Sequence, residues 1–197
     1  MREISWLDTY IPNELRMALG DLVIVAAGVE SSAYAIARIY RIADPQSYSA
    51  KSIIGKLEAR VGDHGIPPWS DVERKQLIAW THAARLRLQM RDVLVHASVT
   101  LGGERPDGKS NTFRWSLRDN AQIDSEAHHV ERLVRLLLSV RRAGIFLEHN
   151  LLYPAPDGGR LQPEYVTFGR VAIPAVEVPA AWSEWAQRAA LGASPHK

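Results

Sequence analysis

The sequence contains no cysteine among its 197 residues. Disulfide bonds, cysteine-ligated zinc sites and a thiol nucleophile are therefore excluded. Lysine is scarce as well, because the 24 basic residues are 19 Arg and 5 Lys. Guanidinium groups match phosphate oxygens better than ammonium groups do, but an Arg-rich and Ala-rich composition equally fits a GC-rich genome. The arginine bias alone therefore does not separate a nucleic-acid ligand from base composition.

A large excess of either charge is also lacking. The formal net charge is +2, which argues against a protein that coats nucleic-acid duplexes but leaves room for a local basic cleft. Apolar residues make up 46% of the chain, enough for a packed core. The length suggests one domain, with or without appendages.

Long apolar runs without charge are missing. The longest, Leu22 to Val29, is far shorter than a membrane span requires. A secretory signal needs an apolar run near the N-terminus, where this chain carries Arg2, Glu3 and Asp8. These absences predict a cytoplasmic protein with no membrane partner.

Apolar residues recur at the three- and four-residue steps of amphipathic helices. This pattern predicts three long helices and one short helix, over residues 14–43, 69–96, 124–150 and 48–61. The predicted core face of the last long helix includes Leu138 and Ile145. In the second long helix, the solvent-facing side is predicted to hold Arg74, Lys75, Arg85, Arg87 and Arg91. The fold class is therefore mainly α, an antiparallel helical bundle.

Residues 97–118 have a different pattern. Two alternating segments flank turn-forming residues from Gly102 to Gly108, which predicts a β-hairpin inserted in the bundle. Arg114 and Arg118 share one face of this hairpin, either as a solvated strand face or as contacts to nucleic acid. The bundle with its hairpin is expected to span 1–152.

Residues 153–197 contain Pro, Gly and Trp in no regular pattern. We expect an irregular C-terminal extension that packs on the bundle or on a second subunit. The histidines offer no metal site: His82 has no second histidine at ligand spacing, and the adjacent His128 and His129 point in different directions on a helix. No metal or other cofactor is therefore expected.

One short run near the end of the second long helix concentrates chemistry. Arg91, Asp92 and His96 bring a guanidinium, a carboxylate and an imidazole together within six residues. Arginine stabilises phosphate, and neutral histidine accepts a proton near pH 7. The combination suits cleavage of RNA through its own 2′-hydroxyl.

A second arginine and histidine have a comparable spacing, at Arg142 and His149. Short motifs of this kind recur by chance. Three features favour the first pair: Asp92 follows its arginine whereas Ala143 follows Arg142, Gly144 interrupts the helical pattern of the second pair, and the apolar run 93–95 is expected to anchor the turn in the core while Arg91 and His96 face a cleft.

The long helices around a short hairpin, with Arg91, Asp92 and His96 near the end of one helix, resemble the HEPN superfamily over residues 14–150. Its motif is an Arg, four to six residues and a His, commonly with a polar residue after the Arg. The resemblance implies a metal-independent endoribonuclease acting as a toxin or antiviral effector, a symmetric homodimer with both motifs lining one cleft, and an antitoxin protein as a partner. Some members carry a modified Tyr two residues after the His; this chain departs from them with Ser98.

In this interpretation His96 removes the proton from the 2′-hydroxyl and Arg91 stabilises the negative phosphoryl oxygens. Asp92 orients one of them or forms a surface ion pair. On an ideal helix Arg91 and His96 lie about 140° apart, so their convergence requires the helix to end or bend near His96. Supporting roles are assigned to further residues: RNA contacts to Arg87, Arg114 and Arg118, orientation of Arg91 to Glu30, and support of the site to Ser98.

Structural, non-catalytic roles remain open for Arg91, Asp92, His96 and Glu30. Arg91 and Asp92 are also consistent with a surface ion pair, His96 with a boundary residue, and Glu30 with a half-exposed glutamate paired to an arginine. On those terms the chain is a HEPN-like module that binds nucleotide, RNA or protein without catalysis. A purely structural helical domain, with its Trp-bearing tail docked on a partner, is the third alternative.

Overall fold

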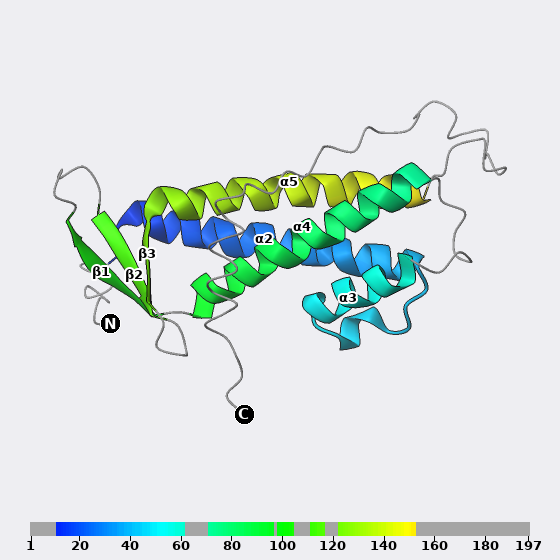
Figure 1. Ribbon diagram of the computed structural model, residues 1–197, viewed down its shortest axis with the longest axis horizontal. Helices are drawn as coiled ribbons and strands as arrows, with labels where there is room; N and C mark the ends of the chain where they lie inside the picture. Colours follow the sequence, from blue (N-terminus) through cyan, green and yellow to red (C-terminus); the bar gives the residue numbers. More distant parts are fainter. Residues whose placement is uncertain (1–10, 62–70, 97, 105–110, 117–121, 153–197) are drawn as a thin grey trace, which may run out of the picture. The chain divides into compact units, whose positions relative to one another are not determined.

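The computed structural model describes residues 11–61, 71–96, 98–104, 111–116 and 122–152 (Figure 1). These residues are mainly helical, which confirms the mainly α class and a bundle of helices, whereas the antiparallel arrangement stays a prediction. In chain order the elements are α2 (Asn13–Ile39), the 3-10 helix η1 (Pro45–Ser47), α3 (Ala50–Val61), α4 (Asp71–His96), β1 (Ser98–Glu104), β2 (Asn111–Ser116), β3 (Gln122–Glu126) and α5 (Ala127–Leu152).

The chain divides into two compact units, and each long helix contributes one half to each unit. Unit 1 comprises residues 1–25, 86–136 and 178–197, and unit 2 comprises 26–85 and 137–177. The predicted extension 153–197 lies outside the described residues, so the division at residue 152 stays a prediction.

The described core of unit 1 comes from the first half of α2, the last part of α4 and the start of α5. Each helix buries a stripe of apolar side chains, and in α2 they follow one another at the three- and four-residue steps that turn one helix face inward. The buried set is Leu15, Ala18, Leu22 and Val25 in α2, Leu88, Met90 and Leu94 in α4, and Val130, Leu133 and Val134 in α5. Each fully buried leucine contributes roughly 1.5–3 kcal/mol of transfer free energy.

The strands of unit 1 form an antiparallel sheet in the order β1-β2-β3. The register shifts between Leu101 and Gly103, which leaves one extra residue in β1, as in a β-bulge. Trp115 in β2 is 1% exposed and is paired with Val99 on one side and Ile123 on the other. The predicted hairpin includes residues outside the described ranges, among them its turn at 105–110, and therefore stays a prediction.

Strand β3 was not expected from the sequence. Asp124 and Ser125, at the start of the helix predicted over 124–150, instead pair with Arg114 and Phe113 in the sheet. Helix α5 begins at Ala127. The polar residues of this short strand resemble a helix start in sequence, and the pairing with β2 becomes apparent only in three dimensions.

Unit 2 holds a close crossing of three helices. The Trp80 indole Nε1 of α4 donates a hydrogen bond to the Val140 carbonyl oxygen of α5, at 2.8 Å. A Cβ placed on Gly144 would lie 2.9 Å from both the Ser32 Cβ and Trp80 Nε1. Glycine is therefore required here by close approach, and α5 runs unbroken through it to Leu152.

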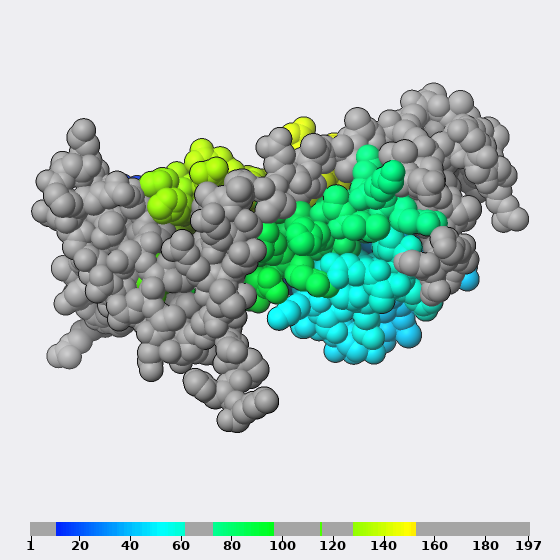
Figure 2. All heavy atoms as spheres, viewed as in Figure 1, coloured from blue at the N-terminus to red at the C-terminus, as the bar shows by residue number. Residues whose placement is uncertain are grey.

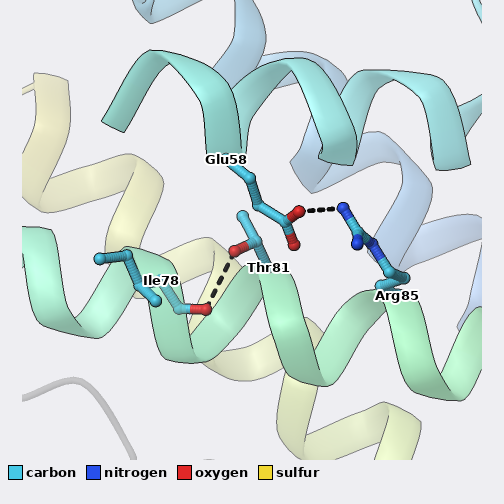
Figure 3. Close-up of polar contacts among 4 residues, drawn as sticks. All are labelled: Glu58, Ile78, Thr81 and Arg85. Atoms are coloured by element: carbon cyan, nitrogen blue, oxygen red, sulfur yellow. Dashed lines mark hydrogen bonds and ion pairs between the residues drawn. The ribbon is translucent and has the colours of Figure 1, made fainter. Parts of the chain in front are cut away.

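Helix α3 packs on the first part of α4 in the same unit (Figure 2). Arg85 on α4 forms an ion pair with Glu58 on α3, and Thr81 one turn earlier donates to the Ile78 carbonyl oxygen (Figure 3). The α3 side buries four apolar residues at helical spacing: Ile53, Ile54, Leu57 and Val61. The polar contact therefore flanks an apolar interface.

Candidate functional site

Arg91 lies in the C-terminal part of α4, within unit 1. Its Nη1 is 3.1 Å from Asp92 Oδ1, and the two side chains are 20% and 49% exposed. A pair this accessible contributes about 0–1 kcal/mol to stability. Its consequence is local: the carboxylate holds one nitrogen of the guanidinium beside the helix surface.

His96 is the last residue of α4 and is exposed to solvent. The helix therefore ends at the point where convergence with Arg91 requires it to end. Both residues are still helical, however, so their Cα–Cβ directions differ by about 140° around the axis. Arg91 and His96 occupy neighbouring turns but do not share one face of α4.

Arg87 lies one turn before Arg91 and is only 1% exposed. Its predicted place on the solvent-facing side of α4 is wrong, because the side chain is inside unit 1. Burial lowers the pKa of the Arg87 guanidinium to about 10, which leaves it charged at neutral pH. The buried position does not support the direct RNA contact that the sequence pattern assigned to it.

The other predicted residues are dispersed. Glu30 is half-buried in α2 and belongs to unit 2, whereas Arg91 belongs to unit 1, so its orienting role stays a prediction. Ser98 is the first residue of β1 and Arg114 lies in β2. Arg118 lies outside the described residues.

The second arginine–histidine pair has a different geometry. Arg142 is exposed and His149 is half-buried, both on α5. Seven helical steps turn about 700°, so the two residues lie about 20° apart around the axis and about 10.5 Å apart along it. Unlike the first pair, they share one helix face.

The structure thus removes one of the three grounds for preferring the first pair. Gly144 does not interrupt the helix as predicted; it sits where Ser32 and the Trp80 indole lie close to α5. Two grounds remain: Asp92 follows Arg91 whereas the small apolar Ala143 follows Arg142, and the run 93–95 has Leu94 buried, although Val95 is exposed. Glycine occurs both where a helix breaks and where two helices pack closely. The sequence alone does not separate these two causes, which explains the error at Gly144.

Three exposed apolar residues surround the second pair. Leu138, Ile145 and Leu152 are 44%, 49% and 53% exposed. The prediction that Leu138 and Ile145 belong to the core is therefore wrong. A sequence signal could have separated them: they repeat every seven residues, whereas the buried positions of α5 form a separate stripe at steps of three and four.

Two features of the described residues bear on membranes and metals. Helix α2 is long and apolar enough to cross a membrane by length and composition, with a mean hydropathy of 1.5 over a window that is 44% buried. Core helices and signal sequences pass the same test. Among the described residues, no group of three His, Asp or Glu side chains is placed to hold a metal ion.

Comparison with known proteins adds no relative. No family model, no curated protein and no solved structure matches this chain. The candidate sites therefore rest on the chain's own residues: the end of α4 with Arg91, Asp92 and His96, and the exposed face of α5 with Arg142 and His149.

Proposed function

We propose that the protein is a metal-independent endoribonuclease that cleaves single-stranded RNA, as a cytoplasmic toxin or antiviral effector. The observation that carries the proposal is the end of α4. There an exposed imidazole, His96, closes the helix five residues after Arg91, a partly exposed guanidinium braced by Asp92. The proposal includes the finer architecture as well, a bundle with a hairpin at 97–118 and a C-terminal extension.

The reaction follows from these two groups. His96 accepts the proton of a ribose 2′-hydroxyl, and the resulting oxygen attacks the adjacent phosphorus. The bond from phosphorus to the 5′-oxygen breaks, leaving a 2′,3′-cyclic phosphate and a 5′-hydroxyl that takes up a proton. Arg91 stabilises the charge that builds on the non-bridging oxygens. Paired RNA does not reach the in-line geometry easily, so the substrate is single-stranded.

The angular separation of the two groups sets a requirement. Because Arg91 and His96 leave α4 about 140° apart, the RNA backbone must pass around the helix end, or the two motifs of a symmetric homodimer must share one cleft. In a homodimer, the Arg that binds a phosphate and the His that accepts the 2′-hydroxyl proton can come from different subunits. An antitoxin protein that covers this helix end would block both arrangements.

The experiment is RNA cleavage in EDTA, with an unstructured 5′-labelled oligonucleotide and a matched 2′-deoxy control. Wild type should yield 2′,3′-cyclic phosphate ends from the RNA only. His96→Ala and Arg91→Ala should each lose at least about 100-fold in rate, while His149→Ala retains activity. Each variant is checked for an unchanged thermal melt. Intact RNA at high protein concentration would overturn the ribonuclease proposal.

A second function, binding without catalysis, is favoured by one specific observation. Arg91 and His96 do not share one face of α4, so a phosphate held by Arg91 does not meet the imidazole of the same helix. This alternative predicts that wild type retains RNA or nucleotide on a filter and yields no products. Arg91→Ala should then weaken binding, whereas His96→Ala should not.

A further inference from the structure

The exposed face of α5 in unit 2 forms a defined stripe, which we call the α5 seam: Leu138, Arg142, Ile145, His149 and Leu152. Its residues follow one another at steps of four, three, four and three, so they fall within about 80° of the helix circumference. This is the spacing of a two-helix seam, in which one helix lays every third or fourth side chain against another. The face on the other side of α5 is already buried, with Val140, Ala143 and Leu147 at 0% exposure.

We propose that a second copy of this chain docks antiparallel on the α5 seam, with the twofold axis passing at Ile145. The axis brings Ile145 against the partner's Ile145 and Leu138 against the partner's Leu152. It also brings Arg142, three residues before the centre, level with the partner's His149, four residues after it. Every seam residue thereby meets a chemically suited side chain. This inference does not depend on the ribonuclease proposal.

Charge selects the antiparallel direction. A parallel pairing would stack Arg142 on the partner's Arg142, two like charges at one level of the seam. The antiparallel pairing instead places each guanidinium beside an imidazole, which accepts an N–H bond through its free-base nitrogen. A self-complementary surface of this kind is what a twofold dimer requires.

The flank of the seam supplies a second, independent pairing. Arg141 and Glu148 are both partly exposed and lie about 20° apart on one side of the seam, where the Arg141 side chain packs over Gly28 of α2. Arg141 is four residues before Ile145 and Glu148 is three residues after it. The same twofold axis therefore sets Arg141 opposite the partner's Glu148, and Glu148 opposite the partner's Arg141. The register therefore needs no adjustment, although the Arg141 guanidinium must turn from Gly28 towards the partner's carboxylate.

The first test is the mass of the full chain by sedimentation velocity across a range of concentrations. Wild type should form a concentration-dependent dimer, weak because three apolar layers make a small interface. Ile145→Asp should raise the dissociation constant at least tenfold. The matched control is Ile78→Asp on α4, since Ile78 and Ile145 are both 49% exposed; it should leave the dimer unchanged. Wild type that stays monomeric, or equal loss in both variants, would overturn the proposal.

Direction is tested by disulfide cross-linking, which is clean because the chain has no cysteine. Ile145→Cys should link two copies under mild oxidation. Leu138→Cys alone should not, because antiparallel packing holds the two copies of this position about 21 Å apart. Leu138→Cys mixed with Leu152→Cys should link across the axis. Self-linking of Leu138→Cys would show a parallel seam and refute the proposed direction.

The charge pairing has its own test. Arg141→Glu and Glu148→Arg should each weaken the dimer several-fold, and the double variant should recover most of the loss. Thermal melts of the monomer keep a folding defect distinguishable from loss of docking.

If the residues 153–197 cover the seam instead, Ile145→Asp lowers the melting temperature without any change in mass. If RNA covers it, Arg142→Ala weakens RNA binding without any change in mass. Either outcome overturns the second-copy proposal.

Discussion

The two compact units use arginine in opposite ways. Unit 1 buries Arg87 to 1% exposure and holds Arg91 at 20%, next to the exposed His96 that ends α4. Unit 2 leaves Arg142 exposed on α5 and reserves its interior for the contact of Trp80, Gly144 and Ser32. Burying a cation costs free energy that apolar packing does not. Unit 1 thus keeps a buried cation at Arg87, whereas unit 2 packs uncharged side chains where Trp80, Gly144 and Ser32 meet.

The same contrast appears in the two arginine–histidine pairs. One motif with a variable gap covers both, yet a gap of four turns the histidine about 140° from the arginine and a gap of six returns it to within about 20°. The pair with the better alignment lies in an apolar seam, and the pair with the acidic neighbour lies at a helix end. Spacing in sequence therefore does not by itself distinguish a catalytic pair from an interface.

The largest expected effect separates the two histidines in one assay. His96→Ala should abolish RNA cleavage, because it removes the general base that contributes about 100- to 10,000-fold to the rate. His149→Ala should keep cleavage within about twofold under conditions where the protein concentration saturates the dimer. The measurement is initial rate in EDTA. Loss of activity only in His149→Ala would place the catalytic site on α5 in unit 2 and contradict its proposed place at the end of α4 in unit 1.

Arg87 tests the cost of the buried cation. Arg87→Ala should lower the free energy of unfolding by about 2–4 kcal/mol, because it leaves a cavity the length of the side chain. Arg87→Met should cost far less, because it fills the stem volume without a charge. Urea melts of both variants at pH 7 measure the difference. Equal losses would mean that the guanidinium itself stabilises unit 1.

The pH dependence of the same side chain has a definite sign. Burial lowers its pKa to about 10 in the folded chain, below the ordinary value of an arginine. Between the folded and the unfolded pKa the unfolded chain binds more protons than the folded chain, so stability rises with pH there. The penalty from Arg87 is complete below about pH 10 and fades above it. Wild type should therefore gain stability relative to Arg87→Met between pH 10 and 11.

Two glycines test the scaffold of unit 2 against the helix surface of unit 1. Gly144→Ala should destabilise by about 1–2 kcal/mol, because its Cβ would meet Ser32 Cβ and Trp80 Nε1 at 2.9 Å, more than offsetting the gain in helix propensity. Gly20→Ala on α2 should stabilise by about 0.5–1 kcal/mol, because nothing lies within 4 Å of its Cβ. Thermal melts give both signs. Stabilisation by both substitutions would show that the α5 crossing is loose.

The sequence carried the mainly α class, because helical periodicity repeats over long stretches such as 69–96, observed as Asp71–His96. Prediction from the sequence was wrong at positions where the same residue type occurs in two different structural environments. Gly144 indicates a helix break or a close approach, Arg87 a solvated charge or a buried one, and Ile145 a core position or an exposed seam. Periodicity ranks the faces of a helix, but only neighbouring elements decide which apolar face is covered. The candidate site shows the same limit, since Arg91 and His96 are adjacent turns in sequence and different faces in space.

The smallest effects come from two ion pairs between described residues, Arg85–Glu58 in unit 2 and Arg91–Asp92 in unit 1. The Arg85–Glu58 pair joins α4 to α3 with side chains 38% and 29% exposed, and solvent screening limits it to about 0.2–1 kcal/mol. The Arg91–Asp92 pair joins adjacent residues of one helix and links no two elements. Glu58→Gln should therefore lower the urea midpoint slightly at low salt and not in 1 M NaCl, where such charges are screened. Asp92→Asn should leave stability unchanged in either buffer. If Asp92→Asn lowers RNA cleavage without changing stability, the carboxylate acts by orienting Arg91. If it lowers stability as much as Glu58→Gln does, Asp92 has a structural role, and the two ion pairs do not differ in function.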